Sequence, residues 1–67
     1  MSNLLSIIKR YYLADLTMPT EQLIELKEVC YTYLQEESPS LKDKNMVLVV
    51  LKRIDYELEA REEQHEQ

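Results

Sequence analysis

Few residues of this 67-residue sequence have the types and the spacing that chemistry needs. Glu62 and His65 have the Glu-x-x-His spacing that supplies two ligands to di-iron centres in helical bundles. Such a centre also needs further carboxylates on an apolar frame, and residues 59–67 contain a single apolar residue, Ala60. We therefore interpret the pair as part of a solvated acidic tail and predict no metal site. A metal-binding helical protein is the alternative interpretation of this pair.

Cys30 is the only cysteine, so a disulfide within one chain is excluded. It falls on the predicted apolar face of a helix, among acidic neighbours that raise the pKa of a thiol and lower its reactivity. We therefore expect Cys30 to pack in the core. With one histidine and no glycine, the sequence also lacks a Ser-His-Asp set, a phosphate-binding loop and a dinucleotide fingerprint. It predicts no catalytic residue, no cofactor and no enzymatic activity.

The chain is acidic, with a net charge of −5. Such a charge repels the phosphate backbone of nucleic acids, whose binding depends on several Lys and Arg side chains. The longest unbroken apolar run, Met46–Leu51, is far shorter than the roughly 20 residues that cross a bilayer. Lys9 and Arg10 follow the apolar start of the chain, which reverses the order found in a signal peptide. We expect no direct nucleic-acid binding and no membrane segment, and the unpaired cysteine favours a cytoplasmic location.

The elements that must position these residues are predicted to be helices. Glycine supplies the positive φ angles that tight hairpin turns need, and its absence argues against a β-rich fold. Pro19 and Pro39 divide the chain into three segments of helical length. We predict a single all-α domain over residues 1–67, with helices at about 3–16, 19–37 and 40–60 and an acidic, frayed tail at about 61–67.

Each predicted helix has one apolar face at helical spacing. The three faces are Leu4, Leu5, Ile8, Tyr11, Tyr12 and Leu16; then Leu23, Leu26, Cys30, Tyr33 and Leu34; then Val47, Leu51, Ile54 and Leu58. Ser40, three residues before Asp43, predicts a variant capping box at the start of the third helix.

The second and third helices are expected to form an antiparallel hairpin, because that arrangement brings opposite charges together. The expected pairs are Glu36 and Glu37 with Lys42 and Lys44, and Glu25 and Glu28 with Lys52 and Arg53. Each exposed pair contributes only about 0–1 kcal/mol, so these pairs favour an orientation more than they stabilise it.

The third helix has more apolar surface than a chain of this size can cover. Its segment Met46–Leu51 is apolar on nearly all sides, and such a helix must be buried on more than one side. Five tyrosines, with no Phe or Trp, add large side chains of a type enriched at protein interfaces. We therefore predict an interface with a second copy of the chain or with a partner. Its candidate residues are Tyr12, Tyr31, Met46, Val49, Val50 and Tyr56.

These features favour a small regulatory protein, of bacterial or phage origin, that binds another protein and modulates its activity. A transcription or signalling factor is one kind of target that would fit, and a homodimer through the third helix is expected. The alternative is a chaperone-like or structural subunit that completes a larger complex. Such a subunit would be molten or aggregated when isolated, whereas a regulator would unfold cooperatively.

Overall fold

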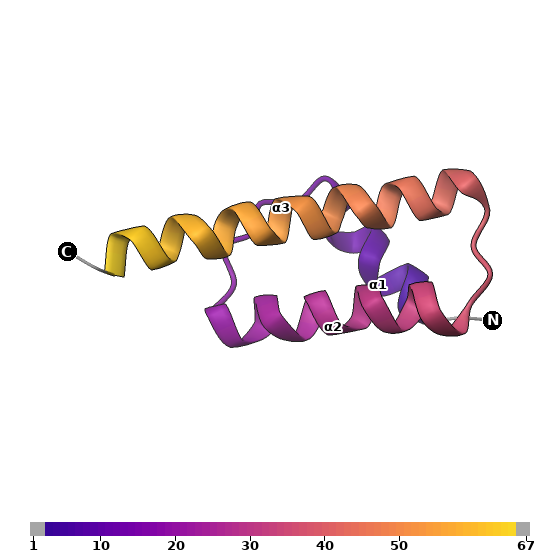
Figure 1. The fold of residues 1–67 in the computed structure, drawn as a ribbon, viewed down its shortest axis with the longest axis horizontal. Helices are drawn as coiled ribbons and strands as arrows, with labels where there is room; N and C mark the ends of the chain where they lie inside the picture. Colours follow the sequence, from indigo (N-terminus) through magenta and orange to yellow (C-terminus); the bar gives the residue numbers. More distant parts are fainter. Residues whose placement is uncertain (1–2, 66–67) are drawn as a thin grey trace.

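The computed structural model describes the backbone of residues 3–65 and the side chains of residues 4–62. Three helices make up the fold: α1 (Asn3–Tyr12), α2 (Thr20–Glu36) and α3 (Leu41–His65) (Figure 1). No strand occurs within the described range, which confirms the prediction of an all-α chain. Within that range no helix combines the length and the apolar character needed to cross a membrane.

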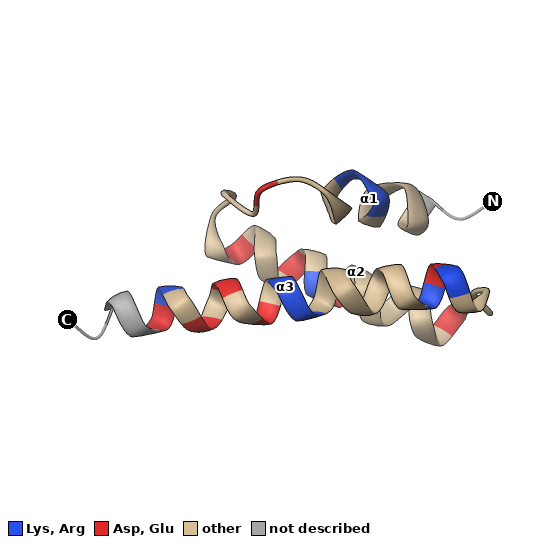
Figure 2. Cartoon of the chain, turned by 90° about the horizontal axis from the view of Figure 1, so that it is seen from above, with Lys and Arg blue, Asp and Glu red and all other residues tan. Residues whose placement is uncertain are grey.

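The helices α2 and α3 lie side by side in opposite directions, as the predicted hairpin requires (Figure 1). The helix α1 packs on one side of this hairpin and contacts both of its helices (Figure 2). The molecule measures 43 × 20 × 18 Å, and it is long because the last turns of α3 extend past the start of α2. Each helix therefore buries one face against the other two.

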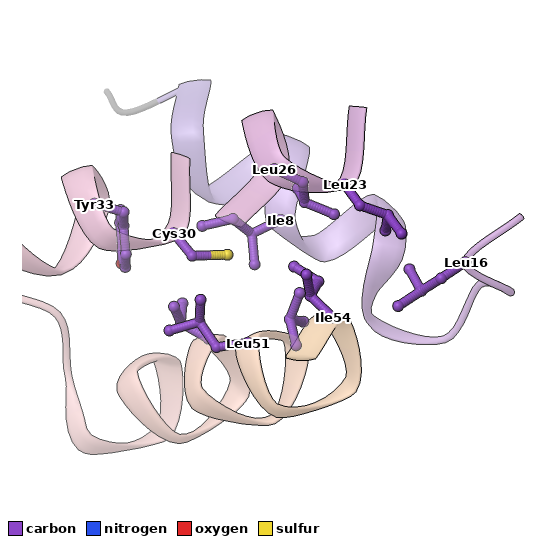
Figure 3. Close-up of a cluster of buried hydrophobic side chains, with 10 residues drawn as sticks. Ile8, Leu16, Leu23, Leu26, Cys30, Tyr33, Leu51 and Ile54 are labelled. Carbon is purple, nitrogen blue, oxygen red and sulfur yellow. The ribbon is translucent and has the colours of Figure 1, made fainter. Parts of the chain in front are cut away.

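The core lies where the three helices meet (Figure 3). Its buried members are Ile8, Leu16, Leu23, Leu26, Cys30, Tyr33, Val47, Val50, Leu51 and Ile54. The inner face predicted for α2 is confirmed in full, since its fifth residue, Leu34, packs against this core while half-buried. Leu58 does the same on α3, so the stripe predicted for that helix is also confirmed.

Val50 requires a correction, because it had been expected on the outer surface of α3. Its side chain is fully buried in the core beside Val47 and Ile54. The reason is that both α1 and α2 contact α3, so the covered arc of α3 is wider than the single stripe read from the sequence.

The helix α1 ends at Tyr12, four residues before the predicted end at Leu16. The guanidinium of Arg53, from α3, donates hydrogen bonds to the carbonyl oxygens of Tyr11, Tyr12 and Ala14. Carbonyls at the end of a helix have no partner within it, so this side chain satisfies groups that a longer helix would have used itself. Leu16 still reaches the core, from the connection between α1 and α2.

Proline and serine define the other helix boundaries. The carbonyl of Pro19 accepts hydrogen bonds from the backbone N–H groups of Gln22 and Leu23, which starts α2. The hydroxyl of Ser40 accepts a hydrogen bond of 3.3 Å from the backbone N–H of Asp43, which confirms Ser40 as the cap of α3. The return bond from the Asp43 side chain, which a complete capping box would have, does not occur among the described hydrogen bonds.

Charge contacts between α2 and α3 differ from the pairs expected from the sequence. Lys27 forms an ion pair of 2.9 Å with Asp55, and this hydrogen bond and charge attraction raise the pKa of Lys27. Among the side chains that the structure describes, none of the expected Glu–Lys and Glu–Arg pairs forms an ion pair. The orientation of the hairpin was predicted correctly, but the individual contacts were not.

The helix α3 continues to His65, five residues beyond its predicted end. Arg61 explains part of this extension, because it bonds to Glu57 one turn earlier and to the carbonyl of Leu16 in the connection before α2. It also donates a hydrogen bond to the hydroxyl of Thr20. The segment predicted as a tail is thus tied to the body of the protein at Arg61.

Candidate functional site

Two grooves lie on the side of α3 that faces α1. The first has a volume of about 750 Å³ and lies between α3 and the connection that follows α1. It is lined by Asp15, Leu16, Thr17, Val49, Lys52, Arg53, Tyr56, Glu57 and Ala60. The second, of about 370 Å³, is lined by Lys9, Tyr12, Lys42, Asp43, Asn45, Met46 and Val49. Val49 lines both grooves, so the two form one continuous surface along α3.

Four of the six predicted interface residues meet on this surface, which we call the α1–α3 face: Tyr12, Met46, Val49 and Tyr56. Tyr56 is 71% exposed and Val49 is 44% exposed, although both are large apolar side chains. Met46 is half-buried and packs against the core with one side. The face therefore combines exposed apolar side chains with one residue, Met46, that is packed against the core.

The other two predicted residues lie elsewhere. Tyr31 is an exposed residue of α2 and lines neither groove. Val50 is buried in the core, so its side chain cannot contact a partner on the surface of this chain. The structure thus separates the candidate set into four residues of the α1–α3 face, one on α2 and one in the core.

Leu13 is the exposed apolar residue that sequence reasoning missed most clearly. It is 88% exposed and lies directly after the end of α1. The apolar spacing from Leu4 to Leu16 predicts a continuous helix, which hid the fact that Leu13 is in a connection. No residue near Leu13 in the sequence predicts that the helix ends at Tyr12, because the hydrogen bonds at this end come from Arg53 on α3.

Two arginines hold the wall of the first groove in place. Arg53 bonds to backbone carbonyls at the end of α1, and Arg61 bonds to the carbonyl of Leu16 at 3.1 Å. The carboxylate of Glu57 accepts a hydrogen bond of 3.1 Å from Nε of Arg61, which fixes that guanidinium. The connection between α1 and α2 is therefore attached to α3 at two points, eight residues apart on that helix.

The sequence singled out Cys30 and the Glu62/His65 pair as residues that could do chemistry. Burial raises the pKa of the Cys30 thiol to about 11, so this side chain is protonated and shielded at neutral pH. Among the side chains that the structure describes, no group of three His, Cys, Asp or Glu is placed to hold a metal ion. The side chain of His65, half of the Glu62/His65 pair, lies outside the described residues.

The α1–α3 face mixes apolar and charged side chains. It holds the exposed side chains of Val49 and Tyr56, the half-buried Met46, and several Lys and Asp side chains. An apolar centre with a polar rim is the usual anatomy of a protein interface. Comparison of the chain with protein-family models, with curated proteins and with solved structures gave no match.

Proposed function

We propose that this protein is a small, non-catalytic regulator that binds another protein through the α1–α3 face and thereby changes the activity of that protein. The observation that carries the proposal is the position of Val49, an exposed apolar side chain that lines both grooves. Exposed apolar side chains gathered in a groove mark interaction sites more often than scattered ones do. The unpaired Cys30 suits a reducing cytoplasm, where we place the protein.

The internal core favours a free-standing regulator over a structural subunit. Nine residues from the three helices and Leu16 from the connection after α1 form one buried cluster inside a single chain. A subunit that completed the core of another protein would lack such a cluster of its own. The purified chain should therefore unfold in one cooperative transition when heated or titrated with urea, and a gradual, probe-dependent transition would favour the subunit instead.

The binding site can be tested with two adjacent residues that are equally exposed. Leu48 is 45% exposed and lines neither groove, whereas Val49 is 44% exposed and lines both. The chain is immobilised, and nuclease-treated lysate of the source cells is passed over wild type, Val49→Glu and Leu48→Glu. We expect wild type and Leu48→Glu to retain the same stoichiometric protein and Val49→Glu to retain at least about tenfold less.

Helical circular dichroism of the three proteins is the control for folding. Equal retention by both variants would remove the α1–α3 face as the site, and retention of no protein by wild type would refute the proposed function. The identified partner is then assayed with and without the chain, which gives the direction of the regulation.

A further inference from the structure

A strip of five exposed residues runs along α3 on the side away from the core. The residues of this outer strip are Asn45, Val49, Lys52, Tyr56 and Glu59. They are separated by four, three, four and three positions, which is the spacing of the seam between two paired helices. All five side chains are exposed, and four of them, Asn45, Val49, Lys52 and Tyr56, also form the α3 wall of the two grooves, while Val47 and Ile54 lie on the opposite, buried side of the helix.

The charges of α3 are divided between its two halves. Its first thirteen residues carry Lys42, Lys44, Lys52 and Arg53 against the single anion Asp43. From there to Glu62 the order reverses, with four anions against Arg61. Figure 2 shows this division as blue ribbon toward the start and middle of α3 and red ribbon toward its end.

This order opposes the dipole of the helix itself. Anions stabilise the start of a helix and cations stabilise its end. In the first turn of α3 the cations Lys42 and Lys44 outnumber the anion Asp43, whereas Glu62 lies in the last turn. The charge order therefore does not serve the stability of the isolated helix. In the part from Lys52 to Glu59, however, it is the order that lets two antiparallel copies of α3 attract each other.

We infer that a second copy of this chain occupies the outer strip, with the two α3 helices antiparallel about a two-fold axis close to Tyr56. In this arrangement Lys52 of each copy lies within one turn of Glu59 of the other copy, and the pair forms twice because of the symmetry. The alkyl chain of Lys52 then packs beside the ring of Tyr56 at the centre of the seam. A polar residue in such a seam fixes its register.

Lys52 and Glu59 are suited to a charge-exchange test because they are too far apart in one chain to pair with each other. They are seven residues apart, which separates them by about 10 Å along the helix, so they cannot pair within one chain. Neither takes part in an ion pair among the described side chains. A charge exchange that restores association must therefore act between two chains.

The inference deepens the proposed function, because Val49 and Tyr56 belong both to the α1–α3 face and to the outer strip. A second copy and a partner protein would compete for these residues. Glu59 lines neither groove, so its substitution affects the dimer without changing the α1–α3 face. The two proposals can therefore fail separately.

The experiment is sedimentation velocity of the full chain over roughly 1–500 µM, a range suited to an interface of small area. We expect wild type to shift from the monomer mass of 8.0 kDa to twice that mass as the concentration rises. Lys52→Glu and Glu59→Lys should each weaken association about tenfold or more, because each replaces two attractions by two repulsions. The double variant should return to within about threefold of wild type.

Charge-matched controls lie away from the strip. Arg10→Glu repeats the charge change of Lys52→Glu on α1, and Glu28→Lys repeats that of Glu59→Lys on α2; both side chains are exposed. Neither control should change the association constant by more than about twofold.

Three results would overturn the inference: a monomer at every concentration, a dimer that the single variants leave unchanged, or a double variant as weak as the single ones. A monomeric chain that still captures a protein through Val49 would leave the proposed function intact and assign the whole face to that partner. Loss of capture by Val49→Glu in a chain that dimerises as described would support both proposals.

Discussion

Nη1 of Arg53 lies 2.6 Å from the carbonyl oxygen of Tyr12, the last residue of α1. The same guanidinium reaches the carbonyl of Ala14 at 2.6 Å and that of Tyr11 at 3.1 Å. A helix of ten residues such as α1 is marginal in isolation, because helices shorter than about 12–15 residues rarely persist in water. One side chain of α3 therefore helps to fix both the end of α1 and the course of the connection after it.

The first prediction concerns these three hydrogen bonds. Arg53→Ala should lower the free energy of unfolding by about 2–3 kcal/mol, because it removes a charged donor and leaves terminal carbonyls without a protein partner. The measurement is urea denaturation followed by circular dichroism. Lys44→Ala is the control, since this exposed side chain of α3 makes no hydrogen bond among those described, and it should stay within about 0.5 kcal/mol of wild type.

Hydrogen exchange locates the effect of the same substitution. Amides of residues 11–16 should exchange faster in Arg53→Ala by local opening. Exchange of amides in the α2–α3 hairpin should change only as much as the free energy of global unfolding changes. If Arg53→Ala and Lys44→Ala were equally stable, the hydrogen bonds from Arg53 would contribute nothing to the fold.

A second prediction tests the cap of α3. Ser40→Ala removes the hydroxyl that accepts from the N–H of Asp43 and should cost about 1 kcal/mol in thermal or urea unfolding. Ser40→Asp retains a cap acceptor and should keep most of the wild-type stability. Ser38→Ala serves as a neighbouring control, because Ser38 precedes Pro39 and caps no helix. Equal losses for Ser38 and Ser40 would show that the bond is unimportant.

Burial of Cys30 predicts a loss of stability at alkaline pH. Its pKa is raised from 9.0 to about 11 in the folded protein, so between these values the unfolded chain releases a proton that the folded chain retains. Well below pH 9 the thiol is protonated in both states, so its ionisation does not affect stability. As the pH rises through 9 and above, the free energy of unfolding declines. At pH 10 the decline attributable to this thiol is about 1.4 kcal/mol by linkage.

The comparison of wild type with Cys30→Ala isolates this effect. The variant should lose about 1–2 kcal/mol at pH 7 because it leaves a small cavity, but it should lack the thiol's part of the decline between pH 7 and pH 10. Urea unfolding at both pH values measures the difference. A thiol reagent gives independent evidence, since it should react with the native chain only as fast as the chain opens. Parallel pH profiles for the two proteins would refute the assignment.

The parts of the fold that were predicted from the sequence depend on local patterns. The helix count follows from Pro19 and Pro39, because proline fits the start of a helix but disrupts its interior. The cap at Ser40 was predictable because it joins residues three positions apart. The apolar faces of α2 and α3 were predictable because a side chain's direction repeats every 3.6 residues.

The parts that were not predicted depend on contacts between residues far apart in the chain. Arg53 and Tyr12 are 41 positions apart, so their hydrogen bond and the early end of α1 have no local signal. The ion pair between Lys27 and Asp55 depends on the exact offset of two helices, which charge counting does not define. Of the six candidate interface residues, Tyr12, Tyr31, Val49 and Tyr56 are exposed and Met46 is half-buried, whereas Val50 lies in the core for the same non-local reason.

The last prediction contrasts Val50 with its neighbour. Val50 is fully buried and Val49 is 44% exposed, although both belong to one apolar run. Val50→Ala should cost about 2 kcal/mol in urea unfolding, because it removes buried methyl groups and leaves a cavity. Val49→Ala should stay within about 0.5 kcal/mol of wild type, and the gain in helix propensity is the same for both changes.

The same two variants separate stability from binding. Val49→Ala, although stable, should weaken capture of a partner or association of two chains, since its side chain belongs to the α1–α3 face and to the outer strip. Val50→Ala should leave both unchanged at temperatures where it is folded, because its side chain lies inside the core. The reverse outcome, a stable Val50→Ala that fails to bind, would mean that α3 is rotated relative to the arrangement described.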